Sequence, residues 1–172
     1  MLSAESATGA FPAEAVATMD RIACEVEQDT NYESILHFRE THSDHTVADA
    51  ISTAAATIAE SLNLKAIICY TATGTTALRV ARQRPRQPIL VLTPVKKTSS
   101  RLNLAWGLHC VVTPDPANTT EMVKIAESVA KAESYAANGD RVIVCAGIPF
   151  KRPGTTNTLR VFKLGEGNTS TK

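Results

Sequence analysis

The chain of 172 residues has few aromatic side chains and no long apolar run. Phe, Trp and Tyr make up 5% of it, and no basic helix carries stacking aromatics between its charges, so we expect no nucleic-acid partner. No run approaches the ~20 apolar residues that span a bilayer, so we expect no membrane partner. The first ten residues lack the basic cluster and apolar stretch of a secretory signal, which favours a cytoplasmic location.

Cysteine and histidine are also scarce, at four residues each. The cysteines form no C-x-x-C pair, and the histidines stand at no ligand spacing, so we predict no metal site. Cys69, Cys110 and Cys145 lie in apolar runs, which favours buried free thiols over a redox role. The sequence shows no Ser/His/Asp or Cys/His arrangement of a nucleophile and a base, and it therefore predicts no catalytic residue.

The charges balance overall but are unevenly distributed along the chain. The net charge is +1, from 18 Lys and Arg and 17 Asp and Glu. Residues 1–60 contain 11 of the acidic residues and two of the basic ones, so an acidic front precedes a basic remainder. Such a basic part either binds a small anion or is a merely solvated face, and the charge pattern alone fits both.

Helical and strand-like patterns alternate along the sequence. One helix is predicted by apolar residues at helical spacing, which follow Phe11 and a proline suited to a first turn. A second, longer helix is predicted to begin at a cap, either Asp44 or Thr46. Helices are predicted over residues 12–26, 32–38 and 46–62, and a polar linker over 41–45.

Four short apolar runs, and a fifth that alternates, predict the strands of one sheet. Runs that are apolar throughout suit parallel strands buried on both faces, and the helical segments between them suit crossover connections. The fifth run follows the fourth too closely for a crossover helix, so we expect an antiparallel edge strand. The predicted strands are 66–70, 89–93, 110–113, 141–146 and 158–164. The fold class is therefore α/β: a three-layer open sheet of about five strands, four parallel and the last antiparallel, with helices on both faces.

A threonine-rich loop follows the first predicted strand and opens a helix. In an open α/β sheet, ligands bind beyond the carboxyl ends of the strands, where a helix N-terminus offers free N–H groups to an anion. Gly74 lets the backbone approach a ligand closely, and Thr71, Thr73, Thr75 and Thr76 add hydroxyl donors. The lysine of a Walker loop is missing. Phosphate binding and plain helix capping both account for this loop.

A second loop, after the fourth predicted strand, brings positive charge. It contains Lys151 and Arg152, followed by Gly154 and Thr155. If the strand order places it beside the threonine loop, two cations face a bound phosphate, and charge-assisted contacts of this type are strong. If the loops lie apart, this one is a solvated turn.

The opening segment and both loops resemble one protein family. Residues 1–16, MLSAESATGAFPAEAV, resemble the segment with which the catalytic barrel of pyruvate kinase ends, roughly M-L-S-x-E-[ST]-A-x-G-x-[FY]-P-x-E-[AS]-V. The threonine loop at 71–76 and the stretch GTTNT at 154–158 resemble that family's C-terminal domain. The likeness covers essentially the whole chain in the right order, and on these motifs the chain is identified as a member of the pyruvate kinase family.

The resemblance implies three parts and a regulatory role. Residues 1–28 correspond to the last helix of the catalytic barrel, 29–165 to an effector-binding α/β domain, and 166–172 to a polar tail. The family's C-terminal domain binds a phosphorylated effector and helps to build a homotetramer. The residues that we expect at the effector phosphate are Thr71, Thr73, Gly74, Thr75, Thr76, Lys151, Arg152, Gly154 and Thr155.

The resemblance also implies what this chain lacks. The complete enzyme of glycolysis transfers phosphate from phosphoenolpyruvate to ADP with magnesium and potassium, and its catalytic lysine and metal ligands belong to barrel segments absent from this sequence. We therefore predict that this chain alone has no catalytic residue, no cofactor and no activity. The alternatives are a stand-alone, non-catalytic module that senses phosphorylated metabolites, and a structural remnant that folds only in an oligomer.

One departure from the family bears on the effector. Members that bind fructose 1,6-bisphosphate often hold its second phosphate with a tryptophan and an arginine at the start of the last long helix. Here the stretch 115–122 reads DPANTTEM and has neither. A sugar monophosphate or AMP is therefore favoured over the bisphosphate, and replacing Thr73 and Thr76 with Ala is expected to weaken its binding.

Overall fold

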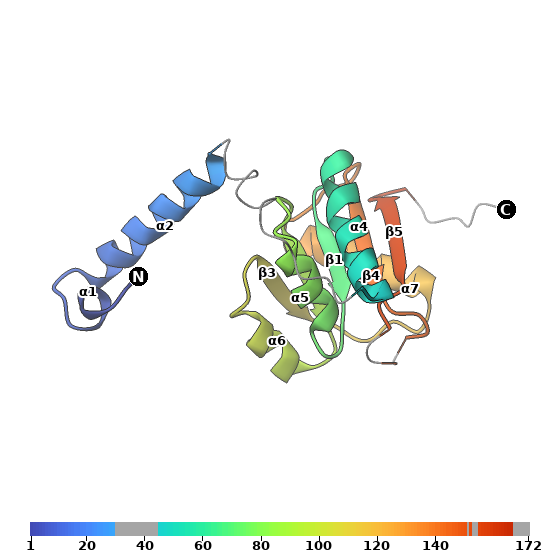
Figure 1. Cartoon of the computed structure of the whole chain (residues 1–172). Helices are drawn as coiled ribbons and strands as arrows, with labels where there is room; N and C mark the ends of the chain where they lie inside the picture. The colour runs from blue at the N-terminus through green and yellow to red at the C-terminus, as the bar shows by residue number, and fades with distance from the viewer. Residues whose placement is uncertain (30–44, 151, 153–154, 167–172) are drawn as a thin grey trace. The chain divides into compact units, whose positions relative to one another are not determined.

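The structure, a computed structural model, describes residues 1–29, 45–150, 152 and 155–166 (Figure 1). The chain divides into two compact units, Met1–Glu40 and Thr41–Lys172. The predicted helix at 32–38, most of the predicted linker and the candidate cap Asp44 lie outside the described residues.

The first unit is helical and carries an exposed apolar stripe. It contains α1 (Ala4–Ala7), which the sequence pattern did not indicate, and α2 (Pro12–Gln28), which confirms the predicted helix and its opening proline. No described residue of either helix is buried. Val16, Ile22 and Val26, at helical spacing on α2, are each about half exposed.

The second unit is a five-stranded α/β sheet with helices on both faces. Its elements are α4 (Val47–Ser61), β1 (Ile67–Tyr70), α5 (Thr75–Arg82), β2 (Ile89–Thr93), α6 (Lys96–Leu102), β3 (Leu108–Val112), α7 (Thr119–Ala132), β4 (Arg141–Ala146) and β5 (Thr158–Lys163). The strand order is β3-β2-β1-β4-β5. All neighbours pair in parallel except β4 and β5, which pair antiparallel, as the sequence predicted.

Alternate residues of each central strand enter two separate cores. Ile68 and Tyr70 of β1 face α7, whereas Ile67 and Cys69 face the layer of α4, α5 and α6. Figure 1 shows α4 and α5 on one side of the sheet and α7 on the other. Because both faces are covered, β1 and β2 are buried throughout, which explains why their sequences are apolar without alternation.

The third strand begins earlier than its sequence indicated. It starts at Leu108, paired with Ile89, and ends at Val112, whereas the expected strand was 110–113. His109 lies within it, and its side chain is 43% exposed. β3 is an edge strand, so a polar residue can remain partly in water while its backbone completes the ladder.

Helix α4 is capped and then anchored through a buried carboxylate. The hydroxyl oxygen of Thr46 accepts a hydrogen bond from the amide of Asp49 at 3.2 Å, which confirms Thr46 as the cap. The carboxylate of Asp49 is 2% exposed and pairs with Arg79 Nε at 3.2 Å and Arg82 Nη2 at 2.7 Å. This ion pair ties the first turn of α4 to α5, the helix that the threonine loop opens.

All four cysteines are free thiols. Cys69 and Cys145 are fully buried neighbours on β1 and β4, as the apolar runs indicated. Their contact and their burial raise the pKa of the Cys69 thiol. Cys110 lies on the edge strand and is only half-buried, and Cys24 is exposed on α2. Burial therefore follows the position of each strand in the sheet and not only its apolar composition.

Candidate functional site

The two loops singled out in the sequence meet where the strand order reverses. The sheet runs from β1 through β2 to β3 on one side, and β4 lies on the other side of β1. In open α/β sheets the crevice beyond the carboxyl ends of two such strands is the usual ligand site. Cys69 of β1 pairs in register with Cys145 of β4, so the loops that follow these strands leave the sheet side by side.

These loops enclose a small polar hollow. Its volume is about 80 Å³. It is lined by Tyr70, Thr71, Ala72, Thr73, Thr75, Thr76, Asp115, Gly147, Phe150, Arg152, Thr155 and Thr156. The hollow is small, so a ligand much larger than a phosphate group would extend beyond it.

Most of the site residues expected from sequence lie together. Thr71, Thr73, Thr75 and Thr76 line the hollow, as do Arg152 and Thr155 of the second loop. Gly74 caps α5 behind the lining. Lys151 and Gly154 lie outside the described residues, and their part in the site stays a prediction.

Helix α6 holds the threonine loop from behind. The hydroxyl of Thr98 donates to the carbonyl of Ala72 at 2.9 Å, and the guanidinium of Arg101 donates to the carbonyl of Thr73. Within the loop, the amide of Gly74 donates to Thr71 Oγ1 at 2.9 Å. The two carbonyl groups therefore bond to α6, and the backbone of the loop is fixed before any ligand arrives.

The first turn of α5 presents unpaired backbone donors. Gly74 is the N-cap, and its carbonyl accepts from the amide of Leu78 at 3.0 Å. The amides of Thr75 and Thr76 precede the first intrahelical donor, and no other described residue accepts from them. Free amides at a helix N-terminus attract anions because they add to the positive end of the helix dipole.

The four threonine hydroxyls have different roles. Thr76 Oγ1 lies 2.6 Å from Thr156 Oγ1, and this buried contact joins α5 to the second loop. Thr71 is likewise occupied by the amide of Gly74. Thr73 and Thr75 are exposed, and their hydroxyls bond to each other at 3.1 Å. The hydroxyls of Thr73 and Thr75 are thus the ones that can turn toward a ligand.

The second loop is closed at its base by two unusual contacts. The side chain of Asn157 accepts from the amide of Ile148 at 2.9 Å and donates to the carbonyl of Ile148 at 2.7 Å. A Cβ atom on Gly147 would lie 2.3 Å from the carbonyl oxygen of Thr155, so only glycine allows this approach. The hydroxyl of Thr155 donates to the carbonyl of Arg152 at 3.0 Å, and the Arg152 side chain is exposed.

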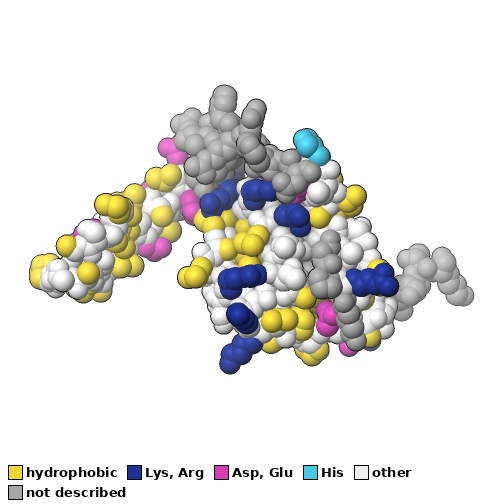
Figure 2. Space-filling model, turned by 60° about the horizontal axis from the view of Figure 1, so that its bottom comes forward, with side chains coloured by type: hydrophobic (Ala, Val, Ile, Leu, Met, Phe, Trp, Pro, Cys, Tyr) yellow, Lys and Arg dark blue, Asp and Glu magenta, His cyan; other side chains and the backbone are white. Residues whose placement is uncertain are grey.

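The far wall of the hollow is neutral at Tyr70 and acidic at Asp115. The phenol of Tyr70 donates to the carbonyl of Met122 at 2.8 Å, which ties β1 to α7. Burial raises the pKa of Tyr70, and the nearby charges of Asp115 and Glu121 add to this effect. Figure 2 turns the lower end of Figure 1 toward the viewer, and its described surface bears more Lys and Arg than Asp and Glu.

Several residues of this site were not predicted from the sequence. Thr156 stood in the family-like stretch at 154–158 but was not singled out, and Phe150 stood beside the two basic residues. Thr98 and Arg101 lie on a separate helix, and no local pattern links them to the loop that they hold. Asp115 was noted only for the aromatic and basic residues that its stretch lacks.

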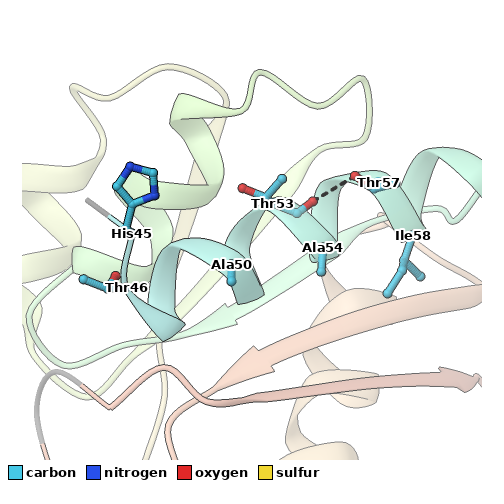
Figure 3. A pocket seen from close by; sticks show the side chains of 7 residues that line it. All are labelled: His45, Thr46, Ala50, Thr53, Ala54, Thr57 and Ile58. Atoms are coloured by element: carbon cyan, nitrogen blue, oxygen red, sulfur yellow. Dashed lines mark hydrogen bonds between the residues drawn. The ribbon is translucent and has the colours of Figure 1, made fainter. Parts of the chain in front are cut away.

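A larger hollow lies along α4 and shares no lining residue with the smaller one. It has a volume of about 620 Å³ and is lined by His45, Thr46, Ala50, Thr53, Ala54, Thr57 and Ile58. Figure 3 shows these side chains following one another along a single helix and the turn before it, with the Thr57 hydroxyl donating to the Thr53 carbonyl at 3.1 Å. Its described lining is mostly small and uncharged, so it lacks the chemistry of the smaller hollow.

The described residues form neither a cluster of metal ligands nor a membrane-spanning helix. Within residues 1–29, 45–150, 152 and 155–166, no three His, Cys, Asp or Glu side chains lie together in a way that could hold a metal ion. No helix of the described segments is long and apolar enough to cross a bilayer.

The fold and the hollow define an open α/β domain with a small polar site at its strand switch point. A family profile, "Pyruvate kinase, alpha/beta domain", matches residues 49–162. A pyruvate kinase of Methylorubrum extorquens is 47% identical over 161 residues, which are 94% of this chain and 34% of that protein. One of Clostridium acetobutylicum is 39% identical, with 94% and 34% covered. The chain belongs to the pyruvate kinase family.

A solved structure agrees with this assignment. The chain resembles the crystal structure of a pyruvate kinase from Cryptosporidium parvum with a TM-score of 0.81 and 30% identity, over 95% of this chain and 32% of the other. The present chain thus spans about a third of the length of the relatives that it matches. It corresponds to the family's C-terminal domain.

Proposed function

We propose that this chain is the effector-binding and assembly part of a pyruvate kinase, and that the hollow between its two loops holds the phosphate of an allosteric effector. The observation that carries this proposal is the meeting of Thr73, Thr75 and Arg152 around one hollow at the switch point. Free amides of α5 and a guanidinium together suit a phosphate, which is a strong hydrogen-bond acceptor with negative charge.

The whole protein would act in glycolysis in the cytoplasm, transferring phosphate from phosphoenolpyruvate to ADP. The names of the relatives support this reaction, and in the proposal it needs protein beyond the third of their length that this chain matches. Magnesium and potassium serve that reaction in the proposal, and no residue of this chain is assigned to hold them.

The proposal includes assembly into a homotetramer. That part of the proposal rests on the family resemblance. A separate observation concerns α2, whose Val16, Ile22 and Val26 are about half exposed in this chain. A helix of this pattern is normally covered by another surface. In the proposal, residues 1–28 are the last helix of the catalytic barrel and 29–165 the effector-binding domain.

The test is calorimetric titration of the 172-residue chain with glucose 6-phosphate, AMP and inorganic phosphate. The variant Thr73→Val/Thr75→Val removes the two exposed hydroxyls and keeps side-chain shape, and Arg152→Gln removes the cation. Each is expected to weaken phosphate binding at least about tenfold, since a hydrogen bond to a charged group contributes about 1.5–3 kcal/mol. Thr76 is avoided because its hydroxyl joins α5 to Thr156.

Thr57→Val on α4 is the matched control, because the Thr57 hydroxyl bonds only within its own helix among the described residues. It should leave the affinity unchanged. Equal affinity of the loop variants and the unaltered chain would remove the hollow from the effector site. If none of the three ligands binds, that result counts against effector binding by this chain.

A further inference from the structure

The hollow contains a negative charge that phosphate binding does not call for. Asp115 follows β3 and lines the same hollow as Thr73 and Arg152. Its side chain is half-buried, and within the described part of the chain no side chain or backbone group donates a hydrogen bond to it or pairs with it. A carboxylate next to an anion site is repulsive, the more so where protein lowers the local dielectric constant.

The backbone that carries this carboxylate is restrained. Asp115 stands between Pro114 and Pro116, and Pro116 is buried. The ring of each proline fixes its own φ, and a residue before proline is held in the extended region. Just beyond, the side chain of Asn118 caps α7 at the amide of Glu121, so the segment is anchored at both ends. The backbone of Asp115 is therefore held beside the hollow.

The wall beside it offers no compensating donor. The Tyr70 hydroxyl is occupied by the carbonyl of Met122, and the charge of Asp115 contributes to the raised pKa of Tyr70 after the larger effect of burial. A carboxylate that accepts no hydrogen bond from the protein has full capacity to accept from a ligand. Hydroxyl groups are the donors that a phosphorylated metabolite carries.

We propose that Asp115 is a specificity-determining residue of the effector site, an inference that rests on the proposed function. Its carboxylate accepts hydrogen bonds from hydroxyl groups of a sugar monophosphate whose phosphate lies at Thr73, Thr75 and Arg152. The same charge repels a second phosphate. The small volume of the hollow, about 80 Å³, fits this division, because it holds the phosphate and leaves the sugar at the rim beside Asp115.

The test compares glucose 6-phosphate, fructose 1,6-bisphosphate and inorganic phosphate by calorimetric titration of the 172-residue chain at fixed ionic strength. The unaltered chain is expected to prefer glucose 6-phosphate to the bisphosphate. Asp115→Asn, which keeps the shape and removes the charge, should lower that preference roughly tenfold, mostly through tighter bisphosphate binding. Asp115→Ala also removes the acceptor and should weaken glucose 6-phosphate further.

Glu60→Gln is the control, because it removes one negative charge at the exposed end of α4, before β1 and at the opposite edge of the sheet. It should leave the preference unchanged. Thermal melting establishes that each variant is folded. The Asn variant reports the loss of the charge, and the Ala variant reports the loss of both the charge and the acceptor. A preference that Asp115→Asn does not change, or a bisphosphate that binds the unaltered chain as tightly as glucose 6-phosphate, overturns the role of Asp115 alone. If no ligand binds the unaltered chain, the proposed function fails and this inference with it.

Discussion

At the scale of single residues, the site depends on positions where a side chain would not fit. Gly74 has φ +93°, and a Cβ atom there would lie 2.9 Å from Leu102 Cδ2. Glycine at this position was expected from sequence because the loop had to approach a ligand. The structure adds a second reason, since Leu102 of α6 packs directly against the loop.

Gly74→Ala should therefore lower the free energy of unfolding, measured in urea, by more than backbone strain alone would lower it. A left-handed conformation costs an L-residue about 1–2 kcal/mol, and displacing Leu102 adds to it. Gly139→Ala is a matched control, because Gly139 has φ +92° and no atom within 4 Å of the added Cβ. If both variants lose the same stability, the contact with Leu102 does not matter.

At the scale of elements, α7 is joined to the end of β5 through one carboxylate. Glu127 Oε1 accepts from Lys131 Nζ at 2.5 Å and from the amide of Gly165 at 2.9 Å. The bond from Lys131 lowers the pKa of Glu127, burial opposes it, and the bond from Gly165 lowers it further. The ionised form is thus favoured by folding, and its contribution to stability is present above the ordinary carboxyl pKa of 4.5.

We expect Glu127→Gln to lower the free energy of unfolding by about 1 kcal/mol at pH 7. The difference from the unaltered chain should shrink as the pH falls below 4.5 and through the lowered pKa, because Glu127 is then neutral, as Gln is at every pH. Urea titrations from pH 7 to pH 3 measure it. Glu60→Gln should change stability by less than about 0.5 kcal/mol at pH 7. A difference that is constant with pH would show that the charge of Glu127 is not what stabilises this junction.

At the scale of the whole molecule, the chain covers about a third of the relatives that it matches. Phosphoryl transfer depends on metal ions and cations placed around the transferred group. The described residues contain no cluster of metal ligands. Because the chain matches about a third of each relative, we predict that the activity of the family needs protein beyond the matched segment.

The purified chain should show no pyruvate formation from phosphoenolpyruvate and ADP with magnesium and potassium, even at high protein concentration. A full-length pyruvate kinase in the same buffer is the positive control. Turnover that rises in proportion to the concentration of the chain, and that survives further purification, would contradict this prediction.

The sequence by itself determined the α/β class, the five strands and the antiparallel edge, because burial on both faces leaves apolar runs that can be recognised locally. It also indicated the threonine loop, since glycine and hydroxyl residues between a strand and a helix have a local meaning. The start of β3 at Leu108 was missed, because an edge strand is completed by pairing with β2 and not by its own apolar residues.

Only the tertiary structure decided how distant segments share one hollow. The pairing of β1 with β4 brings the two loops together, and α6 supplies Thr98 and Arg101 from behind. The bond between Thr76 and Thr156 spans 80 positions, and Asp115 enters from a third loop. The physical reason is that strand order sets which carboxyl ends are neighbours, and no local pattern of residues encodes that order.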